Sequence, residues 1–218
     1  MIAALALLPF TKDQFFAVFA AYNTAVWPAQ FGLLALAIAL VAAIAAKHRH
    51  AGRLAGFGLA LLWAWTALAY HLAFFRDINP AAPWFAAIAL AAALAFALVG
   101  GVQGRLQFLP RHGARALPGW AMVAYAIVGY PAAGALAGHA FPAMPTFGLP
   151  CPTTLFTFGV LLLATPAPPR LLVLGPLLWA LVGGSAAALL DVPQDYALFV
   201  AAAIGVLLLL PAGRRPAQ

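Results

Sequence analysis

The sequence predicts an all-α integral membrane protein, a bundle of about seven transmembrane helices preceded by an interfacial amphipathic helix. Of its 218 residues, 66% are hydrophobic and only 7% are charged, whereas a soluble domain carries roughly a quarter charged residues. The apolar runs are continuous rather than alternating, which is typical of membrane helices and not of membrane strands. A net charge of +7 scattered between apolar runs excludes a nucleic-acid-binding stripe, and the single cysteine excludes an internal disulfide.

Residues 11–27 predict the interfacial helix. Gln14 follows Thr11 by three residues, which is the capping-box pattern of a helix start. Trp27-Pro28 ends or kinks this helix, because proline lacks the N–H that a helix interior needs. Apolar side chains recur at helical spacing in between: Phe15, Phe16, Phe19, Tyr22 and Val26.

Seven apolar runs follow, and we expect them to form one membrane domain that covers residues 1–218. They lie near residues 28–46, 54–75, 80–102, 119–139, 153–167, 170–190 and 196–211. The fifth and seventh runs have only 15 and 16 residues, which rise about 22–24 Å against a hydrocarbon core of about 30 Å. These two are therefore the candidates for re-entrant or broken segments.

The charged residues predict the orientation of the bundle. Nine of the 11 Lys and Arg residues fall in loops on one side: Lys47, Arg49, Arg53, Arg105, Arg111, Arg115, Arg170, Arg214 and Arg215. The other side holds Lys12 and Arg76 with all four acids: Asp13, Asp77, Asp191 and Asp195. The positive-inside rule then predicts an outside N-terminus and a cytoplasmic C-terminus in an inner (cytoplasmic) membrane.

The remaining polar residues gather at the predicted outer end, where we expect a ligand-binding pocket. Its candidate residues are Tyr70, His71, Asn79, His139, Cys151, Thr154 and Asp195. His71 lies about one turn inside its predicted span, and an ionisable residue inside a span is a functional candidate. The alternative is a structural role, in which His71 hydrogen-bonds a loop carbonyl or Asp77.

A metal or haem site is a second interpretation of the same residues. Two prolines flank Cys151 and predict a stiff, extended turn that presents its thiol. A soft-metal set would comprise His71, His139, Met144 and Cys151, and a bis-histidine haem would use His71 and His139. The spacing contains no CxxC or HxxxH pattern, so the sequence requires neither cofactor.

Two further patterns concern helix ends and helix faces. Thr153 or Thr154 is suited to cap the fifth span, whose N-terminus could attract an anion. Small residues permit close helix approach within the bundle or between copies, as in the pairs Gly52/Gly56 and Gly134/Gly138 and the run Gly183-Gly184-Ser185. Trp179 falls within a span, where it serves either packing or an aromatic cavity.

The chain resembles a family of uncharacterised bacterial multi-pass membrane proteins. Four stretches carry the resemblance: 9–16 with Tyr22-Asn23 and Trp27-Pro28, 70–80, 147–159 and 178–195. It covers nearly the whole chain and implies the bundle and the importance of its outer face. It implies no settled activity, so no residue receives a role from it.

We expect the protein to bind, transport or sense a small solute or ion through the outer pocket, with the lipid bilayer as its surroundings. No Walker loop, GxSxG elbow or HExxH motif is present, so this leading hypothesis is non-enzymatic. One alternative is a membrane-embedded enzyme or redox protein that uses His71 as a base or His71 and His139 as haem ligands. Another is a structural subunit that packs on a partner or a second copy through its glycine faces.

Overall fold

The chain forms a bundle of helices in a computed structural model that describes residues 8–109 and 113–210. Within these ranges there is no β-strand beyond two isolated bridges, which confirms the all-α prediction. The helices are α2 (Lys12–Ala25), α3 (Ala29–Ala45), α4 (Ala51–Trp65), α5 (Ala82–Ala95), α6 (Ala116–Ala124), α7 (Tyr130–Leu136), α8 (Pro150–Leu163), α9 (Leu171–Leu190) and α10 (Ala197–Leu209). Three π-helical segments extend them, namely η1 (Thr66–Leu72), η3 (Phe96–Val102) and η4 (Tyr125–Gly129), and two short 3-10 turns are η2 (Phe75–Asp77) and η5 (Pro193–Tyr196).

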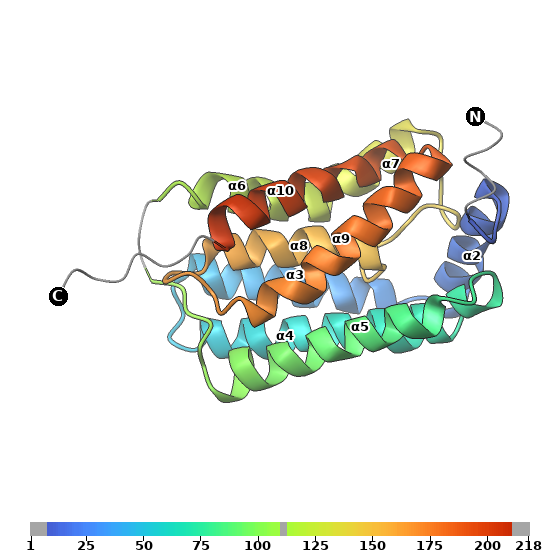
Figure 1. Cartoon of the computed structure of the whole chain (residues 1–218). Coiled ribbons are helices and arrows are strands. Elements are labelled where there is room, and N and C mark those ends of the chain that lie inside the picture. Colours follow the sequence, from blue (N-terminus) through green and yellow to red (C-terminus); the bar gives the residue numbers. More distant parts are fainter. Residues whose placement is uncertain (1–7, 110–112, 211–218) are drawn as a thin grey trace.

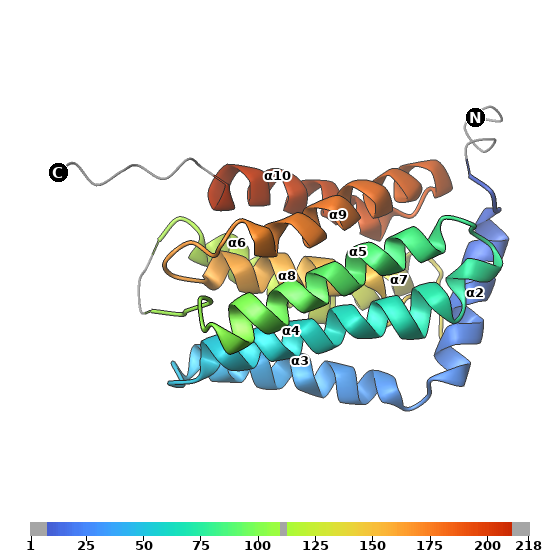
Figure 2. The same ribbon diagram turned by 60° about the horizontal axis from the view of Figure 1, so that its bottom comes forward.

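Helix α2 lies across one end of the bundle, whereas the other helices run along its length (Figures 1 and 2). The chain bends by 88° between α2 and α3, at the predicted Trp27-Pro28 break. The predicted capping box is confirmed: Thr11 Oγ1 accepts from the Gln14 N–H at 3.2 Å, and the Thr11 N–H donates to Gln14 Oε1 at 2.8 Å. Sequence and local geometry thus agree on where this helix begins and ends.

The aromatic face of α2 packs on the bundle. Phe15, Phe19 and Tyr22 are buried, and Tyr22 contacts the rings of Tyr70 and Phe74 edge-on. The helix therefore covers the end of the bundle with the side chains whose spacing predicted its amphipathic character.

Helix α8 occupies the centre of the bundle. All its residues from Pro150 to Leu162 are buried, and α4, α6, α9 and α10 surround it. A helix without a charged residue is suited to such a position, because no face needs to meet water. It ends at Leu163, earlier than the predicted 167, because Ala164 is extended and prolines at 166, 168 and 169 prevent continuation.

Four helical segments are long and apolar enough to cross a membrane, or five if the bent α2–α3 pair is one span. They are Ala51–Asp77, Ala82–Val102, Ala116–Leu136 and Leu171–Leu190, which match four of the predicted spans. Two others, Pro150–Leu163 and Pro193–Leu209, are shorter apolar helices, as their sequences predicted. Seven full crossings stay a prediction.

The two ends of the bundle differ in charge. At the end away from α2, three of the basic loops meet around one cavity. Its lining includes Lys47, Phe108, Arg115 and Thr165. At the α2 end, the Lys12 ammonium donates to the Asp191 carbonyl at 3.0 Å. Arg111, Arg214 and Arg215, which the orientation argument also uses, lie outside the described residues.

The first glycine pair produces a close contact within the chain. A Cβ on Gly56 would lie 2.3 Å from the backbone nitrogen of Gly101, and one on Gly52 would lie 1.9 Å from the Leu106 carbonyl oxygen. This confirms the predicted close approach and assigns it to α4 against η3 and the segment after it. The second pair behaves differently, since Gly138 has a positive φ of 85° and no neighbour within 4 Å of a built Cβ.

Candidate functional site

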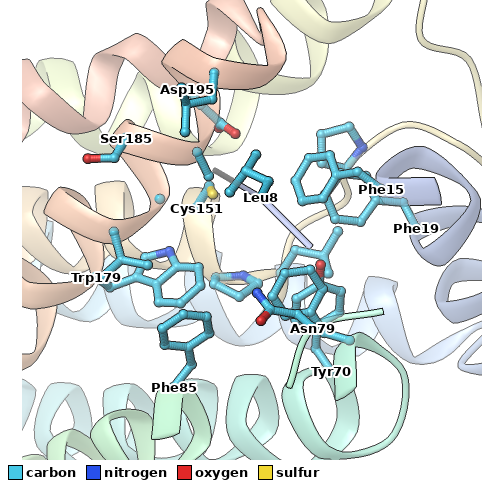
Figure 3. Close-up of a pocket in the computed structure, with 18 of the residues that line it drawn as sticks. Leu8, Phe15, Phe19, Tyr70, Asn79, Phe85, Cys151, Trp179, Ser185 and Asp195 are labelled. Carbon is cyan, nitrogen blue, oxygen red and sulfur yellow. The ribbon is translucent and has the colours of Figure 1, made fainter. Parts of the chain in front are cut away.

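An apolar cavity of about 410 Å³ lies at the α2 end of the bundle and is called the aromatic cavity (Figure 3). Four of the seven predicted pocket residues line it: Tyr70, Asn79, Cys151 and Asp195. The other described lining residues are Leu8, Phe10, Phe15, Phe19, Phe75, Phe85, Tyr130, Pro145, Leu149, Pro150, Trp179, Leu181, Val182, Gly183, Ser185, Ala186 and Leu189. Sequence segments far apart in the chain thus contribute to one site.

Aromatic rings form a continuous wall of this cavity. Tyr70 stacks on Phe75 with ring centroids 5.4 Å apart, and Phe75 lies 6.4 Å from Phe85. Phe85 in turn meets Trp179 edge-on at 5.5 Å. Such offset and edge-on contacts fix the rings relative to one another, so the wall is pre-formed rather than assembled on binding.

The wall includes a π-helical segment, η1, which carries Tyr70 and His71. π-helical turns are rare and frequently occur at functional sites, because the extra residue in the turn redirects neighbouring side chains. Nothing in the apolar periodicity of residues 54–75 predicted this irregular turn.

The polar groups of the cavity lie close together. The Tyr130 hydroxyl donates to Asp195 Oδ1, and both side chains are buried. The Cys151 thiol lies beside Asp195, Tyr130 and Trp179. Figure 3 displays Asp195 and Cys151 together, with Trp179 and Phe85 below them. A carboxyl, a phenol and a thiol therefore converge in surroundings that are otherwise apolar.

Trp179 adds a donor to this cluster. Its side chain is 7% exposed, and its indole N–H lies beside the Cys151 thiol but makes no well-formed hydrogen bond among the described residues. Leaving a buried donor unpaired costs about 1–3 kcal/mol. A ligand with an oxygen acceptor would satisfy this N–H.

The cavity opens along α9. Leu181 and Ser185 line it and are also exposed on the outer surface of the bundle. Leu181 continues an exposed row of leucines along α9 that includes Leu174 and Leu178. The Ser185 hydroxyl donates to the Leu181 carbonyl at 2.7 Å, so its polarity is satisfied within the helix. The opening thus lies on an apolar face.

His71 lies directly behind the aromatic wall rather than in the cavity. Its ring is fully buried, 4.8 Å from the Trp179 ring centroid and 5.9 Å from that of Phe85. Neither ring nitrogen has a hydrogen-bond partner among the described residues, and Asp77 is exposed. The structural alternative, an imidazole hydrogen-bonded to a loop carbonyl or Asp77, is therefore wrong.

The other predicted ligands do not join His71. His139 stacks on Phe16 with centroids 4.0 Å apart, and burial together with the Lys12 ammonium lowers its pKa. Met144 lines a different hollow, beside Trp27 and Phe31. Within the two described ranges, no three His, Cys, Asp or Glu side chains lie close enough to hold a metal ion. The structure thus does not bring the proposed soft-metal set together.

The start of α8 differs from its prediction. Cys151 is helical rather than extended, because α8 begins at Pro150 and prolines are tolerated in the first turn. Leu149 is the N-cap residue, and no side chain caps the helix. The hydroxyls of Thr153 and Thr154 are buried without a partner, so neither threonine acts as the predicted cap, and Thr154 does not line the cavity.

Sequence reasoning missed two contributions to the site. Tyr130, which holds Asp195, carries no motif that marks it among the apolar residues of its span. Asn23 fixes the loop before α8, since its amide donates to the carbonyls of Pro142 at 2.6 Å and Met144 at 2.7 Å. For Asn23 the sequence does contain a signal, because an asparagine interrupts an otherwise apolar helix face.

Fold and cavity together define an all-α bundle with four or five helices able to cross a membrane and an apolar cavity near one end. The chain belongs to DUF6064, a family of unknown function, which matches residues 12–217. This confirms the resemblance to an uncharacterised family. No curated protein and no solved structure matches the chain.

Proposed function

We propose that this protein is a bacterial inner-membrane protein that binds an apolar small molecule in the aromatic cavity. The single observation that carries the proposal is a cavity of about 410 Å³ with a mostly apolar lining and a few convergent polar groups. Ligand sites for small molecules have this character and a volume of about 300–1,000 Å³. The lining favours a ligand with a large apolar part over an inorganic ion or another small polar solute, which the sequence also allowed.

The position of the opening suggests how such a ligand arrives. Leu181 belongs to an exposed row of leucines, and that row is suited to face lipid tails. An apolar molecule dissolved in the bilayer would therefore enter from the side, beside α9. The positive-inside rule predicts that the α2 end is outside, so the ligand would come from the outer half of the membrane.

The first test is whether the purified protein carries such a molecule. Gly183 lines the cavity, so the side chain in Gly183→Leu takes up part of its space; a Cβ there would lie 3.1 Å from both Trp179 Nε1 and Leu198 Cδ1. Gly32→Leu is the matched control, because nothing lies within 4 Å of a Cβ built on Gly32. Organic extracts of the three proteins, prepared from bacterial membranes in a mild detergent, are compared by mass spectrometry.

We expect one apolar species to be enriched in the wild type and in Gly32→Leu and to fall at least tenfold in Gly183→Leu. Leu181→Trp provides a second blocking variant at an exposed position, where folding tolerates the change. Equal amounts of every extracted species in all four proteins would contradict the proposal.

A further inference from the structure

Among the described residues that line the aromatic cavity, one is ordinarily charged and none is cationic. Asp195 is the only residue among its described lining that is charged in its ordinary state at neutral pH, since no lysine, arginine or histidine lines the cavity. Its side chain is 3% exposed. A buried carboxylate without a cation is costly, and proteins usually pair such a group or neutralise it.

Local structure holds this carboxylate against the cavity. Asp191 ends α9 in a left-handed conformation, and the turn of η5 follows, in which the Asp195 N–H donates to the Val192 carbonyl at 3.1 Å. The Tyr130 hydroxyl then donates to Oδ1. This hydrogen bond orients the carboxyl group without supplying a positive charge, and the Cys151 thiol, which also lies beside the carboxyl group, supplies none either.

The facing wall is suited to a positive charge. Aromatic ring faces carry the negative part of a quadrupole and attract cations, most strongly where water is excluded. Tyr70, Phe75, Phe85 and Trp179 form such a wall, and Phe15 and Phe19 of α2 line the same cavity on the side away from Trp179 (Figure 3). An ammonium group in the cavity would be surrounded by aromatic rings and would meet one carboxylate.

We infer that the ligand of the aromatic cavity is a lipophilic organic cation, an amine or quaternary ammonium with an apolar body, and that Asp195 is its counter-ion. This inference rests on the proposed function and names the class of its ligand. An oxygen acceptor on the same molecule would meet the unpaired indole N–H of Trp179. A neutral ligand, bound while Asp195 is protonated, is the competing outcome.

The test compares two probes that differ only in charge. Benzyltrimethylammonium and neopentylbenzene have the same shape, with a cationic nitrogen replaced by carbon. Binding is measured by equilibrium dialysis on the full chain in phosphatidylcholine nanodiscs, as the excess over protein-free nanodiscs. Asp195→Asn removes the charge and keeps an oxygen that accepts from the Tyr130 hydroxyl. Asp191→Asn is the matched control, because it removes a charge from the same segment between α9 and α10, and asparagine tolerates the left-handed backbone of Asp191.

We expect the wild type and Asp191→Asn to bind the cation at least tenfold more tightly than its neutral isostere. Asp195→Asn should lose that preference. A preference that survives in a folded Asp195→Asn protein would overturn the role of Asp195. If both probes bind equally and Gly183→Leu abolishes their binding, the charge inference is overturned and the proposed function stands. If neither probe binds and no molecule co-purifies, both are overturned.

A second measurement needs no substitution. Cys151 is the only cysteine in the chain and lines the cavity, so its alkylation by N-ethylmaleimide reports occupancy. Benzyltrimethylammonium should slow this alkylation at least fivefold at a concentration where neopentylbenzene has little effect. Equal protection by both probes contradicts the charge inference even if Asp195→Asn fails to fold.

Discussion

Gly56→Ala is expected to lower the thermal midpoint of the protein by about 10 °C, the equivalent of about 3 kcal/mol or more. A Cβ at this position would lie 2.3 Å from the Gly101 nitrogen and 2.4 Å from the Gly100 carbonyl carbon. Both are backbone atoms, so no side-chain rotation relieves the clash. Helix α4 must separate from η3, and the dispersion contacts along that interface are lost.

Gly32→Ala is the matched control for this prediction. It is also a glycine within a helix, and a Cβ built there has no neighbour within 4 Å. Alanine has the higher helix propensity, so this variant should be neutral or slightly more stable. Thermal unfolding in detergent, followed by circular dichroism, checks both variants. A drop in midpoint of equal size for Gly32→Ala would show that the close approach at Gly56 is not the cause.

The same glycine illustrates what the sequence can predict about the fold. The spacing of Gly52 and Gly56 predicted a face for close helix approach, because the rule depends only on residue size and helical period. The partner of that face could not be predicted. Gly100 and Gly101 lie more than forty residues away, and only the tertiary arrangement places them opposite Gly56.

Helix starts were predictable to the extent that they depend on local chemistry. Thr11 and Gln14 form the predicted capping box, because both groups lie within one turn. At α8 the same reasoning was wrong, since Thr153 and Thr154 lie inside a helix that begins at Pro150. Burial by the surrounding helices stabilises that first turn without a polar cap, and a single sequence carries no signal for such tertiary packing.

The sequence predicted at which end of the bundle the candidate site lies, but not that aromatic rings form much of its lining. Charge placement directed attention to the outer loops, and Tyr70, Asn79, Cys151 and Asp195 do line one cavity there. The aromatic lining from α2 was not predicted to face a cavity, because helical periodicity identifies a buried face and not its neighbour. His71 was selected as an intramembrane histidine, yet it lies behind the wall of rings.

Asn23→Leu is expected to cost about 4 kcal/mol and to free the loop between α7 and α8. The Asn23 side chain is fully buried, and its amide nitrogen donates to two carbonyls of that loop while Oδ1 accepts from the Thr146 hydroxyl at 2.7 Å. Leucine has a similar volume but leaves all three loop groups unpaired in a partly buried site. Pro145 of the same loop lines the aromatic cavity, so the change also loosens part of the cavity wall.

Hydrogen–deuterium exchange measures this effect where it arises. Backbone amides in residues 140–149 should exchange at least tenfold faster in Asn23→Leu, because the loop opens more often once its hydrogen bonds are lost. Thr24→Val is the control from the adjacent position, since its exposed hydroxyl bonds only the Ala20 carbonyl within α2. Asn23→Asp should resemble Asn23→Leu despite its size, because a carboxylate donates nothing to the two carbonyls and repels them. Exchange that is unchanged in both Asn23 variants would mean that packing of apolar side chains, rather than this amide, holds the loop against α2.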